Sequence, residues 1–383
     1  MDINLIRLGH DNLSIEDKLA NDNYIIDLND ILFDNDYSIV EKANRYLLTI
    51  ILIESDNFKK NIKSYLNQLT NPTLVMPGKS LTAFKGALEI NSELILLNRH
   101  PLLVNGSDQE NAGLIVEVMK AVIAKNNLIN APIALIGEDS NIVIDKTNFG
   151  NINKKYKIDY VRIGTDEFYS YFEKAKIGIL PHKANISKYV KSSSEIKTIN
   201  KIYQALSSII AKYHLKGIAF NIKEFAPYYS FIARLFNEEG ISFIAEDDIY
   251  GLTSLLILNA INDSVALYGY IHNIDLVSNT LLLHSNMVPY SLINKDNNIA
   301  TGPITIFKIS YNARRILAVN AKISGSRVLS PSLLEMDISI EDNEIFDIFR
   351  DPYGGTLAFT YGDSLGNVLA YDNILYIEQN NKN

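Results

Sequence analysis

The feature that most constrains the fold is an alternation of short apolar strands with helical segments through the first two thirds of the sequence. Strand-like runs occur at residues 49–55, 73–78, 93–98, 133–139 and 159–164. Segments between them, such as AGLIVEVMKAVIAK, have helical spacing. Because such alternation is typical of parallel sheets covered by helices, we expect an α/β fold of the doubly wound kind.

Two changes in the sequence pattern divide the chain. Asn126, Asn127, Asn130 and Pro132 interrupt the first alternation. Strands separated by turns replace it after about Asn262, which favours a mainly antiparallel sheet or barrel. We predict an α/β domain at 1–128, a second α/β domain with Glu224 and Asp248 at 129–262, and a β-rich domain at 263–383.

The run SEIKTINKIYQALSSIIAKY, residues 194–213, is the most regular helical pattern. It places Ile196, Ile199, Ile202, Leu206 and Ile209 on one stripe. Ser193 or Ser194 can cap the first turn. We predict a helix here that leads into the strand GIAFNI.

Composition limits the function classes. The net charge is −8 and the 383 residues contain no run of Lys and Arg, so we expect neither nucleic acid nor a membrane as partner. The chain has no cysteine, which leaves carboxylates and imidazoles as metal ligands. No signal peptide or long apolar span is evident, and we expect a cytoplasmic protein with a small neutral or metal-bound substrate.

Two short motifs invite a phosphate or metal interpretation. The GKS at Gly78 lacks the first glycine of a phosphate loop, since position 73 is Thr, and it is better explained as a strand-to-helix turn. The GEDSN at Gly137 follows a strand and is better explained as a turn and helix cap.

The strongest candidate site joins the ends of three strands. Glu224 follows GIAFNI, Asp248 follows ISFIAE, and His284 ends TLLLH. Ligands of open α/β sheets bind at the carboxyl ends of strands, and two carboxylates with one imidazole suit Mn²⁺ or a similar ion. The alternative is that the acids are solvated and cap the next helix, while His284 is a half-buried strand histidine bonded to a carbonyl.

Four blocks in this part of the chain carry a family resemblance. FNEEGISFIAEDDIYGLTSLLI, LLLHSNMVPYSLI, GPITIFKI and GGTLAFTYGD follow in order between about Gly217 and Asp363. Together they resemble the L-fucose isomerase-like branch of the fucose/arabinose isomerase superfamily. The resemblance implies two Rossmann-like parallel-sheet domains and a β-rich C-terminal domain, assembled as homotrimers or homohexamers.

The resemblance also implies the chemistry. Family members isomerise an aldose to a ketose with a Mn²⁺ ion, which here would be bound by Glu224, Asp248 and His284. The two carboxylates would also be the acid and base. Glu246 and Thr356 would contact the sugar substrate.

One departure from the family pattern opens an alternative. Thr356 occupies the place of a histidine that completes the metal site in the family. Threonine is a poor ligand beside imidazole. The chain is therefore either a metal-dependent sugar isomerase or an altered member that binds a sugar or protein partner without catalysis. The sequence does not assign a role to His10, His100 or His182.

Overall fold

The architecture is taken from a computed structural model of the whole chain. It describes residues 1–41, 46–58, 66, 69, 72–97, 99, 101–137, 146–245, 248–262, 265–294, 296, 298–309, 316–330, 333–340 and 356–380.

The chain forms two compact units. Unit 1 consists of Met1–Ile123 together with Leu369–Asn383, and unit 2 consists of Ala124–Val368. The predicted first domain thus nearly coincides with the first segment of unit 1, while the end of the predicted third domain lies in unit 1. The predicted division at residue 262 falls inside unit 2 and stays a prediction.

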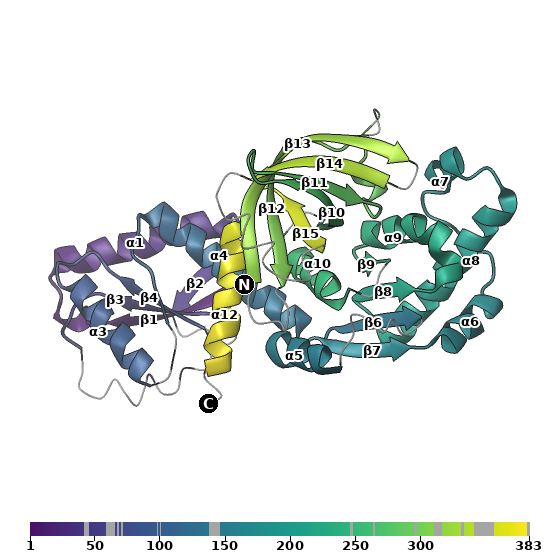
Figure 1. Cartoon of the computed structure of the whole chain (residues 1–383). Helices are drawn as coiled ribbons and strands as arrows, with labels where there is room; N and C mark the ends of the chain where they lie inside the picture. The colour runs from purple at the N-terminus through teal and green to yellow at the C-terminus, as the bar shows by residue number, and fades with distance from the viewer. Residues whose placement is uncertain are drawn as a thin grey trace. The chain divides into compact units, whose positions relative to one another are not determined.

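Unit 1 is built on a five-stranded parallel sheet with strand order β2-β1-β3-β4-β5 (Figure 1). Its strands are β1 (Asp2–Leu8), β2 (Ser38–Glu41), β3 (Thr49–Ile53), β4 (Thr73–Pro77) and β5 (Leu102–Leu103). Its helices are η1 (His10–Asn12), α1 (Ile15–Phe33), α3 (Ala83–Leu96) and the first part of α4 (Asp108–Leu128). From β1 the chain first adds β2 on one side of it and then adds β3, β4 and β5 on the other side. The strand connections therefore change direction between β1 and β3.

The two faces of this sheet differ in their side chains. Ile6, Ile51, Ile53 and Val75 pack with the buried face of α3 in one apolar cluster. Because side chains alternate along a strand, Arg7 of β1 points to the other face, where Asp22 of α1 contacts it.

Unit 2 begins with a four-stranded parallel sheet of order β7-β6-β8-β9. Its strands are β6 (Pro132–Gly137), β7 (Asp159–Ile163), β8 (Gly217–Asn221) and β9 (Ser242–Ile244). Its helices are α5 (Lys146–Tyr156), α6 (Thr165–Lys174), α7 (Lys183–Tyr189), α8 (Ser193–Tyr213), η2 (Lys223–Tyr228) and α9 (Tyr229–Glu238).

A closed antiparallel barrel of order β10-β11-β14-β13-β12-β15 completes unit 2 (Figure 1). The strands are β10 (Leu267–Asp275), β11 (Thr280–Ser285), β12 (Gly302–Ile309), β13 (Ile316–Ser330), β14 (Leu333–Ile340) and β15 (Thr356–Tyr361). A short helix η3 (Tyr290–Leu292) lies between β11 and β12. Helix α12 (Leu365–Asn380) follows β15, and its residues from Leu369 on belong to unit 1. Leucines, isoleucines and other apolar residues from all six strands fill the interior.

Helix α10 (Ile249–Ile261) joins the two sheets of unit 2. It contacts β8 and β9 on one side and β12 and β15 on the other, and nearly all of its side chains are buried. The backbone N–H of Ile309 in β12 donates to Ser254 Oγ of α10 at 3.1 Å. A helix that is apolar on all sides can be stable only when buried in this way.

The predicted mixture of parallel α/β sheets and a later antiparallel sheet is confirmed. The predicted helix at 194–213 is confirmed as α8. The predicted cap at Ser193 or Ser194 is wrong, because α8 begins at Ser193 and Ser192 caps it by accepting from the Glu195 N–H at 3.4 Å. The predicted strand at 93–98 is wrong, because residues up to Leu96 continue α3 and bury Ile90 and Leu94 on its inner face. No helix among the residues that the structure describes is long and apolar enough to cross a membrane.

Candidate functional site

Glu224 and Asp248 follow neighbouring parallel strands. β8 and β9 pair in parallel, and Glu224 and Asp248 come after their carboxyl ends. Both residues therefore lie at the same edge of the sheet. Glu224 lies in η2 and its side chain is exposed to solvent.

Asp248 is the N-cap of α10. Its Oδ1 accepts from the Gly251 N–H at 2.9 Å, and its Oδ2 accepts from the Tyr268 hydroxyl at 2.9 Å. A Cβ added to Gly251 would approach Asp248 Oδ2 and Tyr268 Cε2 to 2.4 Å, so only glycine permits this packing. The capping role that the sequence offered as the alternative is thus present, and the carboxylate is also fixed against the barrel.

His284 lies on the outer face of the barrel. Its neighbour Leu283 is in the barrel interior, so the alternation of a strand directs His284 outward. Its Nε2 lies 2.9 Å from Glu335 Oε2, and both residues are buried, with 7% and 6% of their surfaces exposed. Arg327 also forms an ion pair with Glu335.

The bond from His284 lowers the pKa of Glu335, and the Arg327 guanidinium lowers it further against the opposing effect of burial. The Glu335 carboxyl therefore stays ionised to a lower pH than an ordinary glutamate.

The register of the strands brings three of the predicted regions near β10. Tyr270 pairs with His284 on one side and with the backbone of Thr356 on the other. Tyr268, which bonds Asp248, is two residues earlier on the same strand. Side chains two residues apart on a strand share a face, so Tyr268 and Tyr270 link the surroundings of Asp248 to those of His284.

The predicted metal site is not assembled among the described residues, where no group of three His, Asp or Glu side chains is arranged to hold a metal ion. Asp248 is engaged by Gly251 and Tyr268, and His284 is engaged by Glu335. Glu246 and Asp247 lie outside the described residues, as does the side chain of Thr356. The residues of the GEDSN motif after Gly137 lie outside them too.

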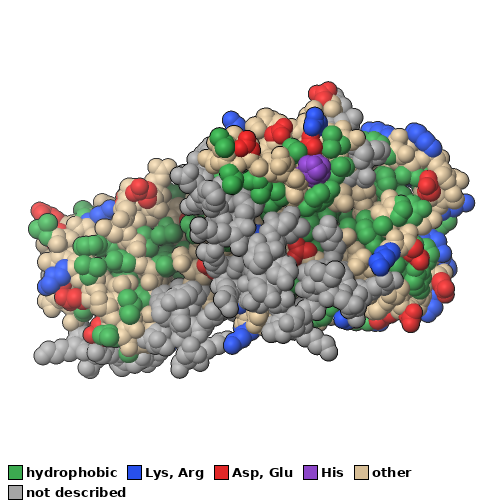
Figure 2. All heavy atoms as spheres, in the orientation of Figure 1, with side chains coloured by type: hydrophobic (Ala, Val, Ile, Leu, Met, Phe, Trp, Pro, Cys, Tyr) green, Lys and Arg blue, Asp and Glu red, His purple; other side chains and the backbone are tan. Residues whose placement is uncertain are grey.

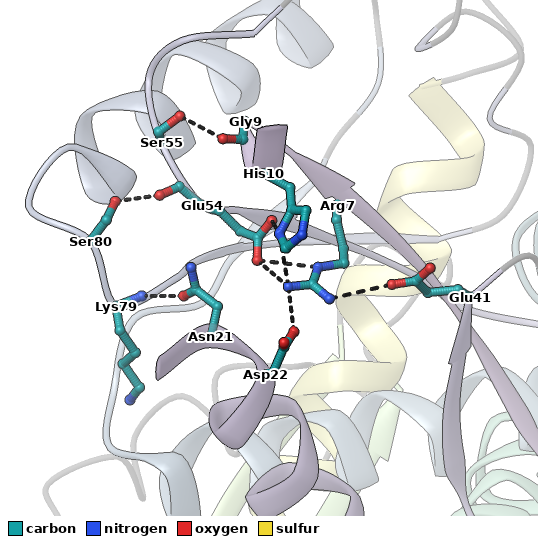
Figure 3. A network of polar contacts seen from close by, with 10 residues as sticks. All are labelled: Arg7, Gly9, His10, Asn21, Asp22, Glu41, Glu54, Ser55, Lys79 and Ser80. Carbon is teal, nitrogen blue, oxygen red and sulfur yellow. Dashed lines mark hydrogen bonds and ion pairs between the residues drawn. The ribbon is translucent and has the colours of Figure 1, made fainter. Parts of the chain in front are cut away.

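A second polar site lies in unit 1, at the point where the strand connections reverse. We call Arg7, His10, Asp22 and Glu54 the switch-point cluster (Figure 3). Glu54 follows β3, and its side chain is fully buried. Its Oε1 accepts from Arg7 Nη2 at 2.6 Å and from Arg7 Nε at 3.1 Å.

Histidine completes this cluster. His10 Nδ1 lies 2.9 Å from Glu54 Oε2 and 3.1 Å from Arg7 Nη2, so one ring nitrogen faces both members of the buried ion pair. The Arg7 guanidinium also pairs with Asp22 at 2.7 Å. Burial opposes the charge on Arg7, but its bonds to Glu54 and Asp22 outweigh that effect and raise its pKa.

The loops around the cluster pack closely. Gly9 has φ +85°, and a Cβ there would lie 2.4 Å from Ser55 Oγ, so this position requires glycine. Asn21 is fully buried, and its Oδ1 accepts from the Lys79 N–H at 2.7 Å (Figure 3). Its Nδ2 has no hydrogen-bond partner among the described residues. The cluster thus presents a partly exposed imidazole beside a buried carboxylate and a guanidinium.

The sequence interpretation missed this cluster. RLGH and IES, at residues 7–10 and 53–55, each place polar residues after an apolar strand, and this was the available signal. Only the strand order shows that the two segments are neighbours, through the pairing of Leu8 with Ile53.

On the face shown in Figure 2, Lys and Arg side chains of the described residues are interspersed with Asp and Glu.

No model of a known protein family matches the sequence, and a search of curated proteins found no significant match.

Proposed function

We propose that the chain is an aldose–ketose isomerase of the L-fucose isomerase-like kind, acting on a small sugar in the cytoplasm as a homotrimer or homohexamer with two Rossmann-like domains. The support is the order of the four sequence blocks and one feature of unit 2. Glu224 and Asp248 leave adjacent parallel strands at one edge, and Asp248 is bonded to the strand that pairs with His284.

The reaction moves a proton between C1 and C2 of the sugar through an enediolate, and a carboxylate can take and return that proton. Asp248 is fixed by two hydrogen bonds. Glu224 is exposed and free of such packing, so it is better suited to reach the carbon-bound proton. In this proposal Glu224 transfers the proton and Asp248 orients the substrate.

The proposal includes Mn²⁺ or a similar cation, which would polarise the carbonyl when bound. The positions of Asp248 and His284 do not fit a three-ligand site in the part of the chain that is described.

The decisive experiment is exchange of the C2 proton of L-fucose and L-arabinose with deuterated water, followed by NMR with and without Mn²⁺. We expect exchange in the wild type and none in Glu224→Gln or Asp248→Asn. Glu173→Gln, which removes an exposed carboxylate from α6 of the same unit, is the matched control and should retain exchange. Wild-type exchange in both site variants would reject the assignment.

A second candidate is a member that binds a sugar or protein partner without catalysis. Thr356 at the expected histidine position favours it, as does the engagement of His284 by Glu335. Sugar binding with no proton exchange at any Mn²⁺ concentration would support this candidate. Thr356→His tests it from the other direction, because a restored imidazole should strengthen Mn²⁺ binding if the family geometry is retained.

A further inference from the structure

Helix α3 of unit 1 presents apolar side chains to solvent on the side that faces away from its buried cluster. Phe84, Leu88 and Ile95 are spaced four and seven residues apart, which places them on one side of the helix. Between 44% and 53% of their surfaces is exposed. Leu81, three residues before Phe84 in the turn that leads into the helix, is fully exposed. We call these four residues the α3 row.

The spacing of the α3 row is that of a seam between two helices. Residues 81, 84, 88 and 95, with Asn91 between the last two, follow one another at alternating intervals of three and four residues. Such a row stays on the side that faces a second helix, because its average interval is close to the period of the helix. The α3 row therefore fits a helix as its partner.

The exposed area is large enough for the centre of an interface. The four side chains expose on the order of a few hundred Å² of apolar surface, which is the size of the largest patch on typical monomers and is often functional. A stable interface covers about 800 Å² on each partner, with a polar rim around its centre. Helix α3 has 14 residues and is about 21 Å long, so the row and its rim supply a large part of that area.

The charges beside the row favour a second copy of α3 that runs antiparallel. Lys85 and Glu89 lie next to the row, with 68% and 49% of their side chains exposed. A two-fold axis at Leu88 places Leu81 of one copy opposite Ile95 of the other, because both are seven residues from the axis. Lys85 of each copy then lies on the same edge as Glu89 of the other. A parallel pair would bring equal charges together.

Helix α1, on the other face of the sheet, provides a contrast. It also exposes apolar side chains along one side, namely Ile15, Leu19, Ile26 and Phe33. It carries five acidic residues and one lysine, so two copies of α1 would repel each other. Helix α3 carries one lysine and two glutamates. Of these two helices, α3 is therefore the one whose surface complements its own copy.

We propose that the α3 row binds a second copy of this chain, with the two α3 helices antiparallel about a two-fold axis at Leu88. Apolar side chains form the centre, and Lys85 of each copy pairs with Glu89 of the other at the rim. A cyclic trimer contains no two-fold axis, whereas a hexamer of two trimers does. The contact itself is independent of the isomerase activity, but its choice of the homohexamer rests on the assembly in the proposed function.

The test is cross-linking of the full chain through a single introduced thiol. The chain has no cysteine, so Leu88→Cys provides the only reactive group. Two thiols form a disulfide only where their Cα atoms lie about 4.4–6.8 Å apart, a condition met close to the two-fold axis. Oxidation should give a covalent dimer on a non-reducing gel. Ile26→Cys, at a similarly exposed apolar position of α1, is the control and should stay monomeric on the gel. No dimer in Leu88→Cys, or equal dimer in both variants, would overturn the proposal.

The mass in solution provides a second test. Sedimentation equilibrium should give six chains for the wild type and three for Leu88→Lys, because two like charges then meet on the axis. Ile26→Lys should keep the wild-type mass, and circular dichroism should show that both variants are folded. If Leu88→Lys fails to fold, Lys85→Glu replaces it. Lys85→Glu should weaken the association roughly 3- to 10-fold, and the double variant Lys85→Glu, Glu89→Lys should restore it.

The outcomes distinguish this inference from the proposed function. A wild-type mass of one or three chains would reject the α3 contact, whereas C2 proton exchange by such a protein would retain the isomerase. A mass of two chains with cross-linking at Leu88→Cys would support the contact and reject the proposed homohexamer. Cross-linking without proton exchange would support the contact and reject the isomerase. A mixed dimer of Leu88→Cys with Ile26→Cys would assign the row to α1 of another copy and overturn the two-fold arrangement.

Discussion

The two units each contain an arginine, a glutamate and a histidine joined through the glutamate. In unit 1 the trio is Arg7, Glu54 and His10, and in unit 2 it is Arg327, Glu335 and His284. The histidine lies 2.9 Å from the carboxylate in both. The bonding is similar, but the exposed member differs.

In unit 1 the histidine is the accessible member, with 35% of its side chain exposed against 17% for Arg7. In unit 2 the arginine is accessible, with 71% of its side chain exposed, and the histidine is buried. The first trio comes from strand β1, helix η1 and the residue that follows β3, and the second lies across paired strands. The same set of bonds thus leaves the imidazole partly exposed in unit 1 and holds it buried in unit 2.

The largest expected loss of stability follows removal of the buried carboxylate of unit 1. Glu54→Ala leaves Arg7 and His10 without their shared partner, and we expect a loss of about 3–5 kcal/mol in the free energy of unfolding. Urea denaturation measures it. Glu41→Ala is the matched control, because Glu41 lies 3.5 Å from Arg7 with 55% of its side chain exposed, and it should cost under about 1 kcal/mol. Equal losses would contradict the difference between buried and exposed partners.

Removal of the arginine from each trio should also change the free energy of unfolding by different amounts, although both losses should be smaller. Arg7→Gln removes the common partner of Glu54 and Asp22, and we expect a loss of about 1.5–3 kcal/mol. Arg327→Gln removes a mainly solvated guanidinium and should cost about 0–1 kcal/mol. Thermal and urea unfolding of both variants would check the order, and a larger loss in Arg327→Gln would reverse the comparison.

A smaller effect is expected where Asp248 meets the barrel. Tyr268→Phe removes the hydroxyl that donates to Asp248 Oδ2, while the capping bond from Gly251 remains. We expect a loss of about 0.5–1.5 kcal/mol in unfolding free energy. Sugar binding should weaken in the same variant if this bond orients Asp248, whereas a loss of stability alone would indicate a structural role.

The smallest expected effect is a pH dependence from Glu335. Its pKa in the folded state lies below the ordinary value of 4.5, and the hydrogen bond to His284 is the largest cause. Its contribution to stability is therefore complete above pH 4.5 and is lost as the pH falls through the lower folded pKa. Urea unfolding from pH 6 to pH 3 should show a shallower loss in Glu335→Gln than in the wild type. Identical slopes would show that the bond adds no stability.

Periodicity was a reliable guide to fold class and to strongly amphipathic helices. Residues 194–213 show this, since Ile199, Ile202, Leu206 and Ile209 are all buried on one face of α8. The run at 93–98 shows the limit, because a short apolar run fits a strand or the end of a buried helix equally well.

The site was less predictable because it depends on register and strand order. The sequence placed Glu224 and Asp248 after adjacent strands correctly, and it also offered the capping role that Asp248 has. It could not reveal that His284 faces Glu335, since that contact joins residues 51 positions apart through β11 and β14. The bulge at His272 interrupts the two-residue period of β10. It also depends on the pairing of β10 with β11, so the sequence did not reveal it.

Unit 1 contains segments from both ends of the sequence, and this affects how the chain folds during synthesis. Residues 369–383 join a unit whose other part ends at Ile123. A ribosome that adds about 5–20 residues per second would release the closing helical segment roughly ten to fifty seconds after the first 123 residues. Newly made unit 1 must therefore wait in an incomplete form, exposed to chaperones and proteases, while the whole of unit 2 is translated.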